Sequence, residues 1–277
     1  MKLIADSGST KTSWVLTKKS NIIQQITTDG INPYYQDENK ICETIKEQLF
    51  TKIESINIDE IYFYGAGCAS PEKNKMIADA LGQFFPTSII AVNSDLLGAA
   101  RSLCGSNAGI AAILGTGSNS CFFSQDEIVK NVSPLGFILG DEGSGAVLGK
   151  KLIGDFLKNQ MPKDLSDLFA STYNINAITT LDRVYKKPFP NRYLASFVPF
   201  MSENKSNKYV YNLIYDSFTE FIVRNIKQYD YQKYPIHFTG SIAYNFKEIL
   251  SEVVSKQNMK LGNITQNPIE GLVRFHK

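Results

Sequence analysis

The sequence predicts an α/β protein built from two similar lobes that face one cleft. A turn rich in Gly, Ser and Thr at 6–12 directly follows an apolar strand. Its shape returns at 115–119, behind the apolar run 110–114. The alternation of strands and helices in the first part of the chain is also repeated in the rest, with larger helical insertions. Because clefts between domains are common ligand sites, the two lobes together predict a binding protein or an enzyme.

The first lobe is predicted from short apolar strands and from helices with one apolar face. Ile41, Ile45 and Leu49 lie four residues apart and indicate a helix near 38–51. Pro71 suits the start of the next helix, which extends to about Phe84. The expected order is an antiparallel meander of strands at 2–6, 13–18 and 22–28, the helix near 38–51, a strand at 61–64, the helix at 71–84, a strand at 89–92 and a helix at 96–103 that Asp95 opens.

The second lobe is expected to repeat this plan around a helical insertion. Prolines at 188, 190 and 199 interrupt a long helix-like stretch at 164–229. We expect strands at 110–114, 120–124, near 128–132, at 236–239 and near 259–264, and helices at 143–160, at 243–256 and from Pro268 onward. The lobes are predicted at 1–103 and 104–277, with an insertion at 143–229 and a terminal helix that can pack back on the first lobe.

Composition excludes several classes of function. The chain has 277 residues, of which 43% are hydrophobic and 20% charged, as in ordinary globular proteins. Its formal net charge of +2 is too small to predict binding to nucleic acid or to an anionic membrane. The longest apolar stretch is far shorter than a membrane span, and an acid at position 6 interrupts the N-terminal apolar run. A cytoplasmic location is therefore expected by default.

Cysteines and histidines are few and separated. Cys42, Cys68, Cys104 and Cys121 form no Cys-x-x-Cys pair and fit reduced, mostly buried thiols better than a disulfide framework or a metal site. The only histidines are His237 and His276. Serine–histidine hydrolysis is therefore poorly supported, and carboxylates are the expected acids and bases.

The two glycine turns carry the strongest chemical signal. A tight turn of Gly and small hydroxyl residues exposes backbone N–H groups and lets a ligand approach the main chain, which makes an anion site. Two such turns can hold the phosphates of a nucleotide from opposite sides, so they predict phosphoryl transfer. Either turn alone fits an ordinary hairpin loop equally well. Neither belongs to a Walker A motif, which the chain lacks.

Carboxylates stand at the ends of predicted strands. Asp6 ends the first strand, Asp95 follows the strand at 89–92, and the pair Asp141-Glu142 lies between glycines. Helix capping is the alternative role of each, because Asp is favoured at helix N-termini. Capping explains the glycine-flanked pair less well, because glycine weakens the start of a helix. Glycine is favoured there when a ligand must come close to the backbone.

Five ordered motifs resemble those of N-acetylglucosamine kinases and, more broadly, the BadF/BadG/BcrA/BcrD ATPase group of the actin and hexokinase superfamily. The resemblance also covers 239–242 and 268–271, and so spans nearly the whole chain. It implies two ribonuclease H-like, actin-type ATPase lobes around an interdomain cleft. The motifs are Asp6-Ser7-Gly8-Ser9-Thr10-Lys11-Thr12, Gly30-Ile31-Asn32, Asn93-Ser94-Asp95, Gly115-Thr116-Gly117-Ser118-Asn119 and Gly140-Asp141-Glu142-Gly143-Ser144.

The resemblance implies ATP and Mg²⁺ as cofactors. Asp6 would hold Mg²⁺, through water because that ion keeps much of its hydration shell. Asp95 corresponds to the base that takes the proton from the attacking sugar hydroxyl. Lys11 would offset phosphate charge, although an ordinary surface lysine explains it equally well. The nucleotide-binding residues would be Gly8, Ser9, Thr10, Lys11, Gly115, Thr116, Gly117, Ser118, Gly240 and Ser241, the last two as the adenosine segment.

The resemblance also implies which residues bind the sugar. Asn32 and Asp141 match positions that bind sugar hydroxyls, with Gly67, Cys68 and Thr116 at the pocket edge. Asn32 also fits a plain turn residue before Pro33. Leu135 stands where the N-acetylglucosamine kinase pattern has a tryptophan, so the acceptor could instead be N-acetylmuramic acid, glucosamine or another hexose.

The predicted activity is the ATP-dependent phosphorylation of an N-acetylglucosamine-like amino sugar at its primary hydroxyl. One alternative is a BadF-type activator ATPase, which drives electron transfer into a dehydratase and needs cysteines for an iron–sulfur cluster between subunits. Another is a non-catalytic regulator that responds to sugar or nucleotide, against which Asp95 argues. Many members of the group form dimers, so a homodimer is allowed, although the sequence indicates no interface.

Overall fold

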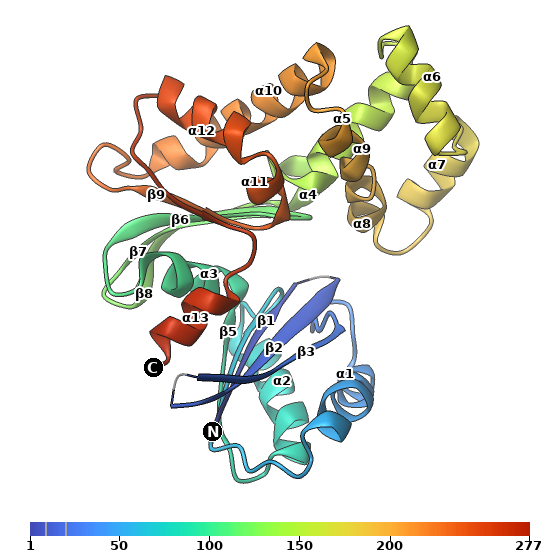
Figure 1. Ribbon diagram of the computed structural model, residues 1–277. Helices are drawn as coiled ribbons and strands as arrows, with labels where there is room; N and C mark the ends of the chain where they lie inside the picture. The colour runs from blue at the N-terminus through green and yellow to red at the C-terminus, as the bar shows by residue number, and fades with distance from the viewer. Residues whose placement is uncertain (9, 20) are drawn as a thin grey trace. The chain divides into compact units, whose positions relative to one another are not determined.

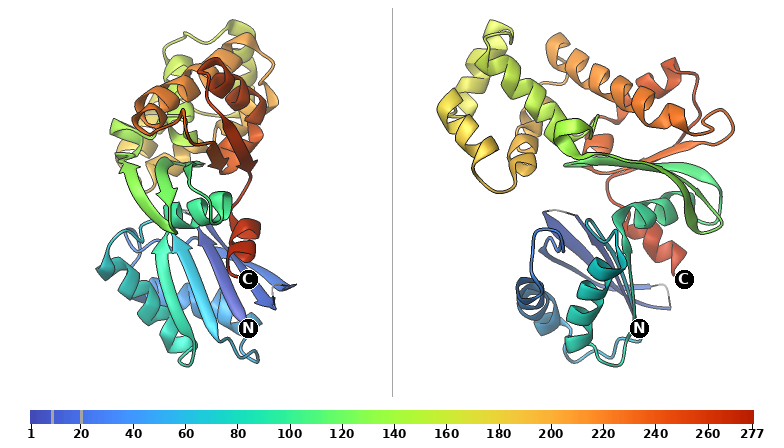
Figure 2. Two further views of the ribbon diagram at one scale, coloured as in Figure 1. Left: turned by 90° about the vertical axis from the view of Figure 1, so that its left-hand side faces the viewer. Right: turned by 180° about the vertical axis from the view of Figure 1, so that it is seen from behind.

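The computed structural model describes residues 1–8, 10–19 and 21–277, which form two compact units (Figures 1 and 2). Unit 1 comprises Met1–Ala108, Phe123–Ile128 and Asn267–Lys277. Unit 2 comprises Gly109–Phe122 and Val129–Gln266. The first division thus follows Ala108, whereas the sequence placed it after residue 103.

Unit 1 contains a five-stranded mixed sheet of order β3-β2-β1-β4-β5. β1 pairs antiparallel with β2 and parallel with β4, and β5 extends the parallel side. The strands are β1 (Lys2–Ser7), β2 (Lys11–Lys18), β3 (Asn21–Asp29), β4 (Glu60–Gly65) and β5 (Ile89–Ser94). All five lie where the sequence predicted strands.

Successive residues of β1 pack on opposite faces of this sheet, as the period of a strand requires. Leu3 and Ala5 join a core with residues of α1 (Glu38–Thr44) and α2 (Pro71–Phe84). Ile4 joins a separate cluster with Leu272 of α13 (Ile269–Phe275). The sheet of unit 1 therefore carries a hydrophobic core on each face, visible as helices on both sides of it in Figure 1.

The predicted helix at 38–51 is wrong in its second half. α1 ends at Thr44 and continues as a π-helical turn (Ile45–Leu49) and a 3-10 turn (Phe50–Lys52). The wider turn keeps Ile45 and Leu49 buried and brings the Phe50 ring to 5.5 Å from that of Phe84. Tertiary packing overrides the regular helical period here.

Unit 2 repeats the strand arrangement in a sheet of order β10-β9-β6-β7-β8. β9 pairs parallel with both β6 and β10. The strands are β6 (Gly109–Leu114), β7 (Ser118–Ser124), β8 (Glu127–Val132), β9 (Ile236–Thr239) and β10 (Leu261–Thr265). The predicted fold class, two α/β lobes each with a similar sheet, is confirmed.

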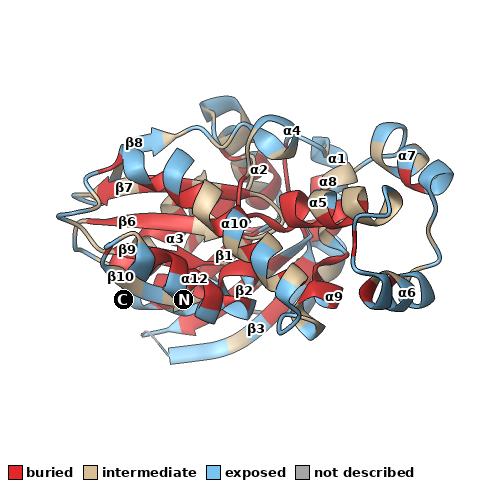
Figure 3. Cartoon of the chain, turned by 90° about the horizontal axis from the view of Figure 1, so that it is seen from above, coloured by how far each residue is buried: buried red, intermediate tan, exposed pale blue. Residues whose placement is uncertain are grey.

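Unit 2 differs from unit 1 in the helices inserted between β8 and β9. Their buried faces share one core with the sheet, and Figure 3 shows buried residues along β6 and exposed residues over most of α7. Pro190 and Pro199 each lie in the first turn of a helix, so the predicted breaks occur there. The helices are α4 (Gly136–Leu139), α5 (Gly145–Leu157), α6 (Lys163–Thr172), α7 (Ala177–Tyr185), α8 (Pro190–Ala195), α9 (Val198–Glu203) and α10 (Lys208–Arg224).

Helix boundaries near the C-terminus differ from the prediction. The helix expected at 243–256 is two helices, α11 (Ser241–Asn245) and α12 (Lys247–Lys256), because Phe246 between them leaves the helical conformation with its ring buried. α13 begins at Ile269, so Pro268 is its N-cap residue and not its first helical residue. α4 has no periodic apolar pattern and was not predicted. Within the described residues no helix is long and apolar enough to span a membrane.

Candidate active site

The carboxyl edge of the sheet in unit 1 brings several predicted site residues together. In the parallel register Asp6 lies beside Tyr64, which lies beside Asn93, and Ser7, Gly65 and Ser94 follow in the same row. The segment 65–68 and Asp95 therefore leave the sheet at the edge where Asp6 lies. In open α/β sheets ligands bind at this edge.

The first glycine turn is closed by its own backbone. Gly8 N–H donates to the Lys11 carbonyl (3.0 Å), and Gly30 N–H donates to the Thr10 carbonyl (3.1 Å). Gly8, Thr10 and Lys11 are exposed, so a ligand can reach the turn. The predicted phosphate ligand Ser9 lies outside the described residues.

Two buried hydroxyl groups support this turn, a role that the sequence did not predict. Ser7 Oγ and Thr12 Oγ1 lie 2.6 Å apart, and Ser7 Oγ also accepts from Ile31 N–H (3.1 Å). They tie the start and end of the turn to the segment that carries Asn32. Their flanking position in the motif was the available signal, but sequence alone cannot separate a ligand from a buried hydroxyl that locks a turn.

Asp6 and Asp95 form an electrostatically coupled pair of half-buried carboxyl groups. Desolvation, followed by the charge of Asp95, raises the pKa of Asp6 to about 7, and Lys11 opposes this shift. Desolvation also raises the pKa of Asp95, although N–H donors at 95 and 96 lower it. A carboxylate with a raised pKa is a stronger base, which suits proton abstraction.

Capping of α3 (Asp95–Cys104) does not explain Asp95. The N-cap residue is Ser94, whose Oγ accepts from Leu97 N–H (3.2 Å). Asp95 is the first helical residue, and its Oδ1 accepts from Leu96 N–H (2.8 Å). The capping alternative is likewise wrong for 141–142, because Ser144 caps α5. At both helices a serine already provides the cap.

Asn32 and Gly67 are packed against each other. Asn32 is buried, and its Oδ1 accepts from Tyr34 N–H (2.9 Å), so the predicted turn role is present. Its amide nitrogen makes no hydrogen bond to any residue that the structure describes, and remains available to a ligand. Gly67 has a φ of +84°, and a Cβ there would lie 2.3 Å from Asn32 Oδ1. Cys68 is buried, and desolvation raises the pKa of its thiol to about 12.

The second glycine turn, between β6 and β7, is held by the start of α5. The N–H groups of Gly145 and Ala146 donate to the carbonyls of Gly115 (2.8 Å) and Thr116 (3.0 Å). Gly240 lies directly on the same turn, because a Cβ there would lie 2.3 Å from the Leu114 carbonyl oxygen. Its φ of +115° also favours glycine. The predicted adenosine segment and the second phosphate turn are thus neighbours.

Asp141 contacts this turn through its side chain. Its Oδ1 accepts from Ser118 N–H (3.3 Å), and a Cβ on Gly117 would lie 3.1 Å from its Oδ2. Asp141 has a left-handed backbone, with φ of 54°. Desolvation is the main cause that raises its pKa to about 6, and the negative charge of Glu142 adds to it. The group is therefore ionised near neutral pH and can accept hydrogen bonds.

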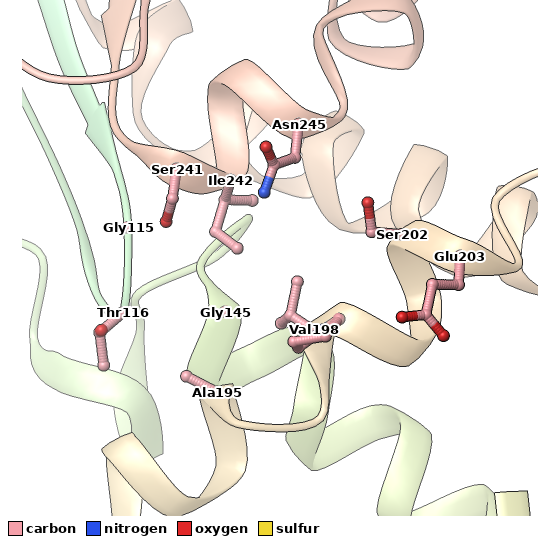
Figure 4. Close-up of a pocket in the computed structure, with 11 residues that line it drawn as sticks. Gly115, Thr116, Gly145, Ala195, Val198, Ser202, Glu203, Ser241, Ile242 and Asn245 are labelled. Atoms are coloured by element: carbon pink, nitrogen blue, oxygen red, sulfur yellow. The ribbon is translucent and has the colours of Figure 1, made fainter. Parts of the chain in front are cut away.

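A pocket of about 380 Å³ opens beside the second turn within unit 2 (Figure 4). Ser241, Ile242 and Asn245 of α11 lie across it from Ala195 and Val198 of the inserted helices. Its remaining lining residues are Gly115, Thr116, Gly145, Pro199, Ser202 and Glu203. The sequence did not predict the walls at 195–203, because helices assembled from separate parts of the insertion leave no local motif.

The donor set fits Mg²⁺ held mainly by water and phosphate. Asp6 would supply a hard oxygen ligand, and a bound cation would offset the burial and the nearby charge of Asp95 that raise the pKa of its carboxyl group. Among the described residues no three His, Cys, Asp or Glu side chains gather into a ligand set of their own. One carboxylate is enough for an ion bound together with a nucleotide, since Mg²⁺ takes its other ligands from water and phosphate.

The sequence profile of the BadF/BadG/BcrA/BcrD ATPase family matches residues 5–273. The chain belongs to this family. The family predicted from the ordered motifs is therefore confirmed. No curated protein matches the chain.

Solved structures share this fold. A candidate N-acetylglucosamine kinase from Porphyromonas gingivalis is 47% identical, with a TM-score of 0.97 over 100% of this chain and 98% of that one. A candidate N-acetylglucosamine kinase from Chromobacterium violaceum is 14% identical, with a TM-score of 0.79 over 100% and 98%. A ROK family glucokinase from Streptomyces griseus, in complex with glucose and AMPPNP, is 12% identical, with a TM-score of 0.55 over 99% and 97%. The latter two show the fold alone.

Proposed function

We propose that the protein transfers the γ-phosphate of ATP to the primary hydroxyl of an amino sugar such as N-acetylglucosamine. The class, an ATP-dependent sugar kinase, agrees with the ATPase family and with the name of the 47% identical protein. The amino sugar itself is suggested by the name of the Porphyromonas gingivalis protein, which is 47% identical over the full chain.

The observation that carries the proposal is the pocket beside the second glycine turn. Its volume of about 380 Å³ lies in the range of small-molecule sites. Ile242 and Val198 provide apolar walls for a base, while Thr116 and Gly115 lie at the pocket margin. Adenosine bound in this pocket would direct its phosphates toward the turn, and Gly240-Ser241 would contact the nucleoside.

Asp95 is the proposed base. A carboxylate of raised pKa at a helix start can accept the proton of an alcohol as the alcohol attacks the γ-phosphate. Asp6 is proposed to hold Mg²⁺, which when bound neutralises charge on the phosphates. Gly8, Thr10 and Lys11 would contact the phosphates from the first turn, and Ser9 is included from its motif.

Asn32 and Asp141 are the proposed partners of the ring hydroxyls. Asn32 offers an amide nitrogen as donor, and Asp141 offers an ionised carboxylate as acceptor. Polar partners of this kind reject analogues that lack the hydroxyl, because a buried group is then left unpaired. Gly67, Cys68 and Thr116 are proposed to line the edge of the sugar pocket.

The activator alternative is disfavoured by the placement of the cysteines. Cys68, Cys104 and Cys121 are buried, and only Cys42 is partly exposed. A cluster shared between subunits needs thiols at the surface of each subunit. The arrangement therefore supports the kinase over the electron-transfer ATPase.

A coupled assay of ADP release with a panel of sugars tests the proposal. We expect release only when N-acetylglucosamine or a close amino sugar is added together with Mg-ATP. The same protein with Asp95→Asn controls for contaminating kinases. If no amino sugar is turned over, the substrate class is wrong, and sugar-independent ADP release would favour a plain ATPase.

A further inference from the structure

Glu142, next to the proposed sugar ligand Asp141, is a buried carboxylate with a charged partner on another element. Its Oε1 forms an ion pair with Arg224 Nε of α10 at 2.9 Å. Its Oε2 accepts from the Asn225 side-chain amide at 3.1 Å. Only 6% of Glu142 is exposed, so both carboxylate oxygens are occupied inside the protein.

The backbone around Asp141 adopts left-handed conformations, which are stable only when neighbouring residues hold them. Asp141 and Gly143 both lie in the left-handed region, at φ values of 54° and 74°. Gly143 N–H donates to Ser217 Oγ of α10 (3.2 Å), and Asp141 N–H donates to the Pro134 carbonyl (2.9 Å). A non-glycine residue in this region persists only where neighbouring contacts enforce it.

α10 and the residue that follows it thus hold the 141–143 turn at three points. Arg224 and Asn225 bind the Glu142 carboxylate, and Ser217 binds the Gly143 amide. The side chain that this turn presents is Asp141, which contacts Ser118 of the second glycine turn. Small errors in the placement of a polar ligand weaken substrate binding strongly.

We propose that Glu142 is a positioning residue through which the end of α10 fixes the Asp141 carboxylate for the sugar acceptor. The inference rests on the proposed function of Asp141 as a sugar ligand. Glu142 does not contact the sugar itself, since both its oxygens bind α10 and Asn225. Its role is to hold the left-handed turn that directs the neighbouring side chain.

The charge of Glu142 gives this role a distinctive signature. Two charged groups act on Asp141 besides the backbone: Glu142 raises its pKa and Lys150 of α5 lowers it. Neutralising Glu142 therefore lowers the pKa of Asp141 while leaving its position less well held. If Glu142→Gln only reduced the amount of folded protein, the pKa of Asp141 in the remaining folded molecules would not change.

The experiment compares Glu142→Gln with Glu220→Gln in the full chain, with N-acetylglucosamine as the probe. Glu220 pairs with the same Arg224 (3.6 Å) and with Lys151 of α5 (3.0 Å), and among the described residues no hydrogen bond or ion pair joins its side chain to the 141–143 turn. We expect Glu142→Gln to raise KM for the sugar about tenfold and KM for ATP by less than about twofold. Sugar binding measured without nucleotide should also extend to lower pH than in the unaltered protein. Glu220→Gln should resemble the unaltered protein.

Arg224→Gln decides the question if Glu142→Gln does not fold. Arg224 is half exposed, so a Gln at this position stays hydrated, while the buried Glu142 carboxylate keeps only Asn225 as its partner on α10 and the residue after it. The turn is then held less firmly, and the same split between the two KM values is expected. Equal changes in both KM values, or equal effects of Glu142→Gln and Glu220→Gln, would overturn the inference. Failure of the unaltered protein to phosphorylate any amino sugar would instead overturn the proposed function.

Discussion

The two units share one strand order but differ in what stands at the ends of their strands. In unit 1 the carboxyl edge carries acids, Asp6 and Asp95. In unit 2 the strands β6 and β9, which correspond to β1 and β4, end in backbone turns at Gly115 and Gly240 beside a pocket. One fold therefore provides two kinds of site, because chemistry depends on the residues that follow the strands and not on the sheet.

The units also differ in the length of the connection after the third strand. Unit 1 joins β3 to β4 through α1 and two short turns, whereas unit 2 inserts α4 to α10 between β8 and β9. These inserted helices supply Val198 and Ser202 to the pocket and Arg224 to the Asp141 turn. The insertion therefore supplies one wall of the pocket that we propose as the nucleoside site.

The largest effect is expected from the acid of unit 1. Asp95→Asn removes the proposed base but keeps the side-chain size and the Ser94 cap of α3. We expect kcat to fall by about 10²–10⁴ while ATP affinity changes little, because the proposed nucleotide pocket belongs to unit 2. Steady-state kinetics and nucleotide titration measure both. Nearly full kcat would remove Asp95 from the mechanism.

A glycine of unit 2 should give the opposite pattern. A Cβ at Gly240 would lie 2.3 Å from the Leu114 carbonyl oxygen and would displace the second turn. We expect Gly240→Ala to weaken ATP binding at least about tenfold and to destabilise the fold by about 2–4 kcal/mol. Gly105→Ala is the matched control, since Gly105 also has a positive φ but no atom within 4 Å of an added Cβ. Equal losses of ATP affinity in both variants would show that backbone strain alone is responsible.

Low pH should destabilise the two units to different extents through His276 in unit 1 and His237 in unit 2. Desolvation, with the charges of Arg101 and Lys2, lowers the pKa of His276 in unit 1 to about 4, and Glu60 opposes this shift. Since the unfolded chain takes up the proton near pH 6.5, this group stabilises the fold fully above pH 6.5 and loses its contribution as pH falls toward 4. The expected loss is about 1–2 kcal/mol after allowance for partial exposure.

Denaturant unfolding of His276→Gln and His237→Gln at several pH values checks this expectation. His276 contacts Tyr64 OH through Nε2 (2.8 Å) and stacks on the Tyr62 ring, which anchors α13 to the sheet of unit 1. The His276 variant should lose less stability than the unaltered protein between pH 6.5 and 4. A His237 variant with the larger effect would contradict the contrast, because His237 in unit 2 has a lowered pKa without such charged neighbours.

The smallest effect is expected at Leu135. This residue is 58% exposed at the start of α4, with a left-handed backbone. Leu135→Trp should raise the preference for N-acetylglucosamine over glucosamine by about a few-fold. This is less than the about 10–200-fold that fully buried apolar contacts of ~1–3 kcal/mol provide, because the position is largely exposed. Ratios of kcat/KM for the two sugars measure it. Unchanged ratios would place Leu135 away from the acceptor.

Strands and glycine turns were predictable because local pattern determines them. The alternation around Ile4 and the run 110–114 each indicate a strand, and Gly, Ser and Thr residues between two strands indicate a tight turn. The π-turn after Thr44 and the break at Phe246 were not predictable, since both follow from packing against distant residues. The same holds for Val198, Glu203 and the Glu142–Arg224 pair, whose partners are far away in the sequence.

The position of the transferred phosphate tests the central claim most directly. Phosphorus NMR of the product made from N-acetylglucosamine and Mg-ATP reports how many protons couple to the phosphate. Transfer to the primary hydroxyl predicts a triplet from the adjacent methylene group. A doublet would place the phosphate on a secondary or anomeric oxygen and contradict the account, as would the absence of any sugar phosphate when ADP is released.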